Sequence, residues 1–175
     1  RSEHPLIKIG RNSLETYSWI EDLNENSQAT ILVEVQSMKV IRTKNGENMA
    51  FLQASDTKKK LDITIFPDTY KQIGNKIVEG QFYYLTGKIK ERDGHLQMIL
   101  SAIQKASSER FWVQLENHDY DLEISQLLEK YSGDIPVVLR YENEKRTVVA
   151  SQYRVQKSDS LQEELNNYSM KTVFR

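Results

Sequence analysis

Two changes of sequence pattern predict a small β barrel followed by a separate α+β domain. Residues 29–106 read as three strands, a short helix and two more strands, which is the element order of a five-stranded OB-fold barrel. Residues 107–175 read as βαββαβ, the order of a split βαβ, ferredoxin-like layout. A polar linker, "QKASSER" at 104–110, separates the two patterns, and residues 1–28 form a lead-in segment.

The lead-in segment carries apolar residues at roughly helical spacing between positions 14 and 23. This spacing predicts either a short helix or an ordered tail that packs on the following domain. The residues concerned are Leu14, Tyr17, Trp19, Ile20 and Leu23.

The barrel strands are predicted from alternation and from turn signals. In the first strand Ile31, Val33 and Val35 share one face. The turn "KNGEN" supplies a glycine for a hairpin, and Pro67 suits the first turn of a helix. The predicted strands are 29–42, 49–56, 61–66, 81–90 and 95–104, with the helix at 67–77.

The second domain is predicted from two helical segments set between strands. The first helix, from 121, is expected to close at Gly133, and the second has Ser158 or Ser160 as N-cap candidates. The expected strands are 110–116, 135–141, 146–153 and 171–175.

Composition and motifs exclude several classes of site. The 175 residues include no cysteine, which excludes disulfides, thiolate zinc sites and cysteine nucleophiles, and favours a reducing cytoplasm. No apolar run reaches the roughly 20 residues that span a bilayer, so no membrane association is expected. No nucleophile elbow or phosphate-cradling loop occurs. We predict no catalytic residue, metal or cofactor.

The histidines and one pair of carboxylates are the candidates for metal ligands, and neither set is expected to bind a metal. His4, His95 and His118 lie far apart and are expected to be solvated surface residues. Asp56 and Asp62 flank the basic turn "TKKK", where a metal-binding pair is conceivable. Capping and solvation of that turn is the preferred interpretation.

Charge is distributed unevenly along the chain. Residues 29–106 carry twelve Lys and Arg against eight Asp and Glu, whereas residues 107–175 carry nine against twelve. The middle segment therefore suits a polyanion.

An OB barrel offers a groove across its second and third strands, rimmed by the first and fourth connecting loops. The first loop brings Arg42 and Lys44, and the fourth brings Lys88, Lys90 and Arg92. Cations there would neutralise phosphates, and an aromatic side chain would stack a base. Phe51 is the stacking candidate, with a place in the core as the alternative. Edge protection or solvation is the alternative for the lysines.

Several motifs carry a resemblance to a known family. The stretch "TKNGENMAFLQASDTKKKLDITIFPDTY" resembles the OB segment near the C-terminus of bacterial DNA polymerase III α subunits of the DnaE type. "SEHPL" at 2–6 and "LTGKIKERDG" at 85–94 resemble flanking parts of the same region, and "GDIPVVLRY" is a weaker match in the second domain. The matching residues are Thr43, Lys44, Gly46, Met49, Ala50, Phe51, Asp56, Phe66 and Pro67.

The resemblance implies a non-catalytic fragment of a replicative polymerase, because the family's catalytic domains lie outside such a segment. Its OB-fold domain would bind single-stranded template DNA. Residues 107–175 would form an interaction domain that docks the clamp loader or another replisome subunit, and a protein-interaction module is the alternative for the whole chain. An RNA-binding OB domain is a third possibility. Ser55 stands where related tRNA-binding modules place arginine, which disfavours a tRNA ligand.

Overall fold

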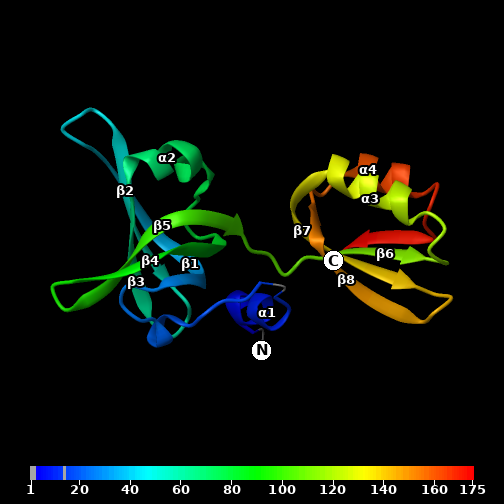
Figure 1. The fold of residues 1–175 in the computed structure, drawn as a ribbon, viewed down its shortest axis with the longest axis horizontal. Coiled ribbons are helices and arrows are strands. Elements are labelled where there is room, and N and C mark those ends of the chain that lie inside the picture. The colour runs from blue at the N-terminus through cyan, green and yellow to red at the C-terminus, as the bar shows by residue number, and fades with distance from the viewer. Residues whose placement is uncertain (1–2, 14) are drawn as a thin grey trace. The chain divides into compact units, whose positions relative to one another are not determined.

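The computed structural model describes residues 3–13 and 15–175 and divides the chain into two compact units (Figure 1). The first unit is Arg1–Ala106 and the second is Ser107–Arg175. Within the described residues, no helix is long and apolar enough to cross a membrane.

The first unit contains a closed barrel of five strands in the order β1-β2-β3-β5-β4. This confirms the predicted OB-fold, with a helix between the third and fourth strands. The elements are β1 Gln28–Arg42, β2 Asn48–Ser55, β3 Lys60–Ile65, α2 Pro67–Ile73, the 3-10 turn Gly74–Lys76, β4 Phe82–Arg92 and β5 His95–Lys105.

The strand β1 closes the barrel because it pairs with two neighbours. Residues 28–34 pair with β4, and residues 34–42 pair with β2. A bulge between Val35 and Ser37 switches which residues face the interior. Val35 is fully buried, whereas Lys39, which strict alternation would turn inward, is exposed.

The core of the barrel is filled by inward-facing side chains of all five strands and is covered by α2. Tyr70 and Ile73 of this helix pack against the core cluster, and the helix contacts β2 and β5. The seam between β3 and β5 is parallel and short, since only residues 62–64 pair with residues 97–99. The barrel is therefore held least extensively along this seam.

The lead-in segment is ordered, but its helix lies earlier than the apolar spacing predicts. The helix α1 spans Pro5–Arg11, and His4 caps it by accepting a hydrogen bond from the amide of Leu6 at 3.1 Å. The predicted helix at 14–23 is wrong, although Leu14 lies outside the described residues. Residues 15–23 form the 3-10 turn Ile20–Asp22 and an isolated bridge between Ser18 and Ile31.

The alternative of an ordered tail explains the apolar residues of the lead-in. Ile20 and Leu23 belong to the core cluster of the barrel. The buried carboxylate of Asp56 accepts a hydrogen bond from the amide of Ile20 at 2.7 Å, which fixes the segment against the barrel. This tertiary contact overrides the local helical spacing.

The second unit has the predicted βαββαβ element order but not the predicted strand order. Its sheet runs β8-β7-β6-β9, so the parallel strands β6 and β7 are direct neighbours. A split βαβ would have another strand between them, and the ferredoxin-like arrangement is therefore not confirmed. The elements are β6 Phe111–Leu115, α3 Asp121–Lys130, β7 Ser132–Tyr141, β8 Arg146–Val155, α4 Asp159–Leu165 and β9 Lys171–Phe174.

The predicted helix end at Gly133 is wrong. The helix α3 ends at Lys130, and Gly133 lies in β7. A Cβ at Gly133 would approach the amide nitrogen of Gln156 to 2.4 Å. The glycine therefore permits a close approach of backbone at an irregularity of the β7–β8 ladder, between Ser132 and Ile135.

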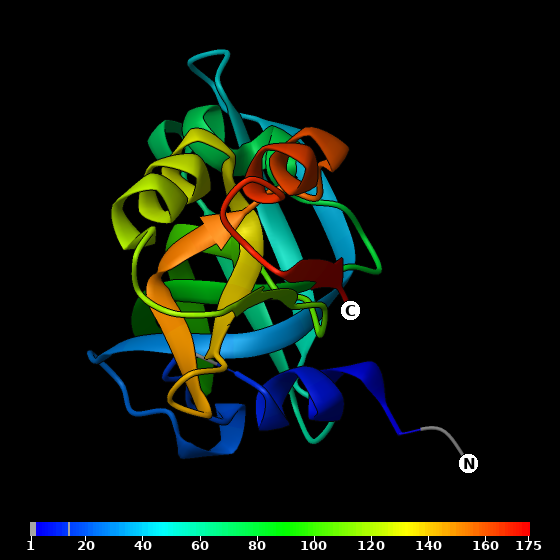
Figure 2. The same cartoon turned by 90° about the vertical axis from the view of Figure 1, so that its right-hand side faces the viewer.

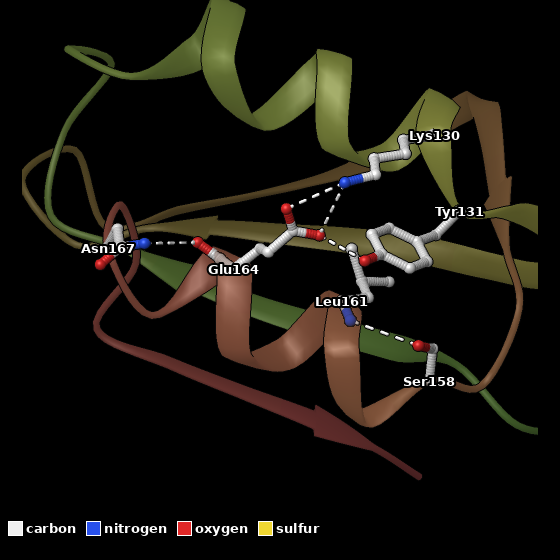
Figure 3. Close-up of polar contacts among 6 residues, drawn as sticks. All are labelled: Lys130, Tyr131, Ser158, Leu161, Glu164 and Asn167. Atoms are coloured by element: carbon white, nitrogen blue, oxygen red, sulfur yellow. Dashed lines mark hydrogen bonds and ion pairs between the residues drawn. The ribbon is translucent and has the colours of Figure 1, made fainter.

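The helices α3 and α4 lie side by side on one face of the second sheet (Figures 1 and 2). Glu164 of α4 links them, since its carboxylate accepts hydrogen bonds from Lys130 Nζ, at 3.0 Å, and from the hydroxyl of Tyr131 (Figure 3). These bonds, that of Tyr131 first, lower the pKa of Glu164. Ser158 is the N-cap, accepting from the amide of Leu161 at 3.3 Å.

The loop before α3 carries a cluster around His118. Its Nδ1 lies 2.8 Å from Asp121 Oδ2, and its Nε2 lies 3.2 Å from Glu144 Oε1. The imidazole stacks on Tyr141, whose hydroxyl donates to Asp121 Oδ1 at 2.9 Å. Burial, then the bond to Asp121, raises the pKa of Tyr141 to about 12. His118 is a surface residue, as predicted, but a paired one.

We expect Gly87→Ala to destabilise the barrel. A Cβ at Gly87 would lie 2.1 Å from the carbonyl oxygen of Ile99, next to the β4–β5 bulge, so backbone must move. Overpacking of this kind costs about 1–3 kcal/mol or more in the free energy of unfolding. Lys88→Ala, at the adjacent exposed position, should cost less than about 0.5 kcal/mol. Equal losses in denaturant titrations of the two variants would contradict the prediction.

We expect Asp121→Asn to lower the pKa of His118. Hydrogen bonds to Asp121, and then to Glu144, raise this pKa above its ordinary value of 6.5. The charged imidazole therefore stabilises the unit fully below about pH 6.5, and this contribution is lost as the pH rises through the raised value. An NMR titration of the imidazole signals measures the change.

In that titration Glu144→Gln should lower the pKa of His118 by less than Asp121→Asn, because Asp121 makes the larger contribution. The signal of His95, in the other unit, is the internal control. An unchanged His118 titration in Asp121→Asn would show that the carboxylate contacts do not persist in solution.

Candidate functional site

The outer surface of the barrel is hollowed across β2, β3 and the β4–β5 hairpin. The hollow measures about 410 Å³. Of the six residues predicted to bind nucleic acid, it contains Phe51 and Arg92. The full lining is Phe51, Leu52, Asp62, Ile63, Thr64, Arg92, Asp93, His95, Leu96 and Gln97.

Phe51 lies on the outer face of β2 and is 39% exposed. Its neighbours across the strands are Lys39 of β1 and Thr64 of β3. The alternative of a core position is therefore wrong. An aromatic ring held open to solvent beside a cation is the arrangement that base stacking requires.

Arg92 is positioned by a tight hairpin. Asp93 and Gly94 form its two-residue turn, with φ angles of 53° and 80°. Positive φ at both positions is typical of a type I′ turn, which Asp-Gly favours. The turn pairs Arg92 with His95 at the rim of the hollow. Asp62 and Asp93 also line the hollow, so its charge is mixed rather than uniformly basic.

Lys88 and Lys90 face outward on β4, on the face opposite the buried Leu85 and Ile89, as the parity of the strand predicts. Their neighbours in β5 are Ile99 and Gln97. Lys90 Nζ donates a hydrogen bond to Asn26 Oδ1 at 3.3 Å. Neither lysine lines the hollow. They lie on the outer surface of β4, which is next to β5 and one strand further from the hollow.

Arg42 and Lys44 belong to the β1–β2 hairpin, whose tip lies at the upper left of the barrel in Figure 1, whereas the β4–β5 tip lies at the lower left. Arg42 Nε donates to the carbonyl of Gly46 at 3.2 Å, and Gly46 has a φ of 79°. The guanidinium thus braces its own turn. Neither Arg42 nor Lys44 lines the hollow.

Sequence reasoning missed Lys39. Alternation along β1 assigns it to the core face, together with Val33 and Val35, and only the bulge after Val35 turns it outward beside Phe51. The one available signal was chemical, since a lysine rarely occupies a core position.

The two carboxylates beside the "TKKK" turn have different roles. Asp56 Oδ1 accepts hydrogen bonds from the amides of Lys58, at 3.0 Å, and Lys59, at 2.9 Å, so this residue caps the turn as expected. Asp62 instead faces outward in the hollow. Among the residues described, no group of three or more His, Cys, Asp or Glu is placed to hold a metal ion.

Comparisons with known proteins show which family the chain resembles. Residues 29–106 match a family model described as an OB-fold nucleic acid binding domain. DNA polymerase III subunit alpha of Streptococcus pyogenes serotype M3 is 43% identical over 99% of the chain, which covers 17% of that protein. The subunit alpha of Bacillus subtilis is 30% identical over 84% of the chain and 14% of its own length.

Among solved structures, a domain of replication protein A from Methanococcus maripaludis aligns with a TM-score of 0.45 and 18% identity. It covers 53% of the chain and 99% of that domain.

The resemblance to the DNA polymerase III α-subunit family is thus confirmed along nearly the whole chain, and residues 29–106 carry that region's OB-fold. The chain spans about a sixth of the length of the curated relatives that it matches.

Proposed function

We propose that the barrel binds single-stranded DNA across β2, β3 and the β4–β5 hairpin. Phe51 stacks a base, and Lys39 and Arg92 contact phosphates on either side. The observation that carries the proposal is the exposed Phe51, set between Lys39 and a hollow that Arg92 borders. Arg42, Lys44, Lys88 and Lys90 attract the strand from a greater distance.

In the whole protein, this region would hold the single-stranded template and leave nucleotide transfer to other domains. The support is the relationship to DNA polymerase III α subunits, of which this chain covers 17%.

We expect Phe51→Ala to weaken the binding of oligo-dT about 5- to 150-fold, because stacking contributes about 1–3 kcal/mol per base. Fluorescence anisotropy of a labelled oligonucleotide, titrated with the 175-residue chain at low salt, measures the loss. Phe66→Ala is the matched control, since Phe66 is 49% exposed and does not line the hollow.

We expect Arg92→Ala and Lys39→Ala each to reduce the dependence of affinity on salt. Each phosphate contact contributes about 0.7 to the slope of log affinity against log salt on a single strand. Lys8→Ala, an exposed position on α1, should leave that slope unchanged. Equal affinities and slopes for the parent chain, Phe51→Ala and Arg92→Ala would refute the site.

Competition between oligo-dT and oligo-U separates a DNA-binding from an RNA-binding barrel. We expect DNA to compete at least as well as RNA, because the relatives of this chain are DNA polymerase subunits. A clear preference for RNA would favour the alternative of an RNA-binding OB domain.

A second candidate function is the docking of another replisome protein, such as the clamp loader, by the second unit. Its acidic charge and two exposed apolar residues at the start of α3 favour this. Tyr120 is 47% exposed and Leu122 is 65% exposed.

We expect Leu122→Asp to reduce the capture of replisome proteins by the immobilised chain. Val78→Asp, at a 55% exposed apolar position in the first unit, is the control. Capture that is insensitive to Leu122→Asp would exclude this surface.

A further inference from the structure

The sheet of the second unit has one face that its helices do not cover. Phe111, Val113 and Leu115 of β6 point toward α3 and α4 and form the core of the unit. The intervening residues, Trp112 and Gln114, therefore point to the opposite face. Figure 1 shows both helices on one side of the sheet, and no described element of the unit crosses the other side.

An apolar row crosses this open face from edge to edge, with one residue from each strand. The row is read from the strand register: Trp112 pairs with Val138 on one side and Val173 on the other, and Val138 pairs with Val149. Val149 is 44% exposed, whereas the central Val138 is covered by its neighbours at 6%. The indole thus lies in a flat apolar strip.

A row of polar and positively charged residues runs directly beside the apolar row. Gln114 pairs with Arg140 and with Lys171, and Arg140 pairs with Thr147. The guanidinium of Arg175 lies 4.8 Å from the centre of the Trp112 ring. The two rows enclose a hollow of about 290 Å³, lined by Trp112, Val113, Gln114, Arg140, Glu142, Thr147, Lys171, Val173 and Arg175.

The charge of this hollow is opposite to that of the unit that carries it. Three cations line it against the single carboxylate of Glu142, which pairs with Arg140 Nε at 3.1 Å. Residues 107–175 as a whole have nine Lys and Arg against twelve Asp and Glu. Lys171 is exposed and belongs to no ion pair within the described part of the chain. Positive charge is therefore concentrated where the indole is.

We propose that this open face is a second binding site for single-stranded nucleic acid, separate from the barrel. One base stacks on Trp112 beside the valine row and displaces the guanidinium of Arg175 from the ring, and Lys171 and the displaced Arg175 contact the adjoining phosphates. Arg140 contributes its Nη2, because Nε donates to Glu142 and Nη1 donates to Thr147. A flat aromatic strip bordered by cations suits a base and its phosphate better than it suits a peptide, which extends a sheet at its edge.

Tryptophan fluorescence tests the proposal directly, because the chain has only two tryptophans. Trp19→Phe leaves Trp112 as the sole reporter, and adding Phe51→Ala and Arg92→Ala removes the proposed barrel site. Titration of this variant with oligo-dT at low salt should quench Trp112 saturably. An unquenched signal overturns the proposal without affecting the barrel, which the anisotropy titrations test.

Lys171→Ala in the same background should weaken the quenching titration and lower its salt slope by about 0.7. Lys145→Ala is the matched control, because Lys145 is exposed in the β7–β8 turn, outside the hollow. Quenching that Lys171→Ala and Lys145→Ala alter equally would mean that the strand binds elsewhere, and would overturn the assignment.

The role of the ring is tested by anisotropy in the background without the barrel site. Trp112→Ala should weaken binding about 5- to 150-fold, and Trp112→Phe should restore most of it. Circular dichroism spectra exclude a loss of fold as the cause. Polyglutamate is the alternative ligand: quenching by polyglutamate but not by oligo-dT would assign the face to an acidic peptide and overturn the proposal.

Discussion

The strand β1 is hydrogen-bonded to β4 along its first half and to β2 along its second half, and Glu34 pairs with both. This double pairing closes the barrel and leaves it no open edge. The bulge after Val35 bends β1 and so allows one strand to pair with both neighbours. The bulge also decides the chemistry of the surface, because it turns Lys39 outward beside Phe51. The closure of the barrel and the position of Lys39 at the candidate site thus depend on the same bulge.

Much of the first unit follows from the sequence because its strands alternate and its turns carry glycine. The positions of the strands and of the helix along the chain depend on nearby residues, and the two-residue Asp93–Gly94 turn is a local signal. The position of Lys39 could not be predicted in this way, since a bulge is fixed by the strand on the other side of the ladder. Burial of Ile20 likewise required Asp56, which is 36 residues away.

The second unit shows a different limit of sequence reasoning. Periodicity indicates which residues form strands. The order of the strands depends on which edge of the sheet each new strand pairs with, and periodicity does not specify this. Here β9 pairs with β6 and leaves β6 and β7 in direct contact. The predicted helix end at Gly133 failed for a similar reason. A glycine that ends a helix cannot be told from sequence apart from a glycine that allows close approach of a neighbouring backbone. The open face, with Trp112 and Lys171, becomes visible only once the register is known.

The parallel seam between β3 and β5 joins three residues of each strand, fewer than any other ladder of the barrel. The hollow takes Thr64 from one side of this seam and Gln97 from the other. A ligand that contacts both residues would add interactions across the ladder that has the fewest paired residues. Conversely, separation of β3 from β5 would disrupt the hollow itself, because residues of both strands line it. At this ladder, ligand binding and the closure of the barrel therefore depend on the same pairing between β3 and β5.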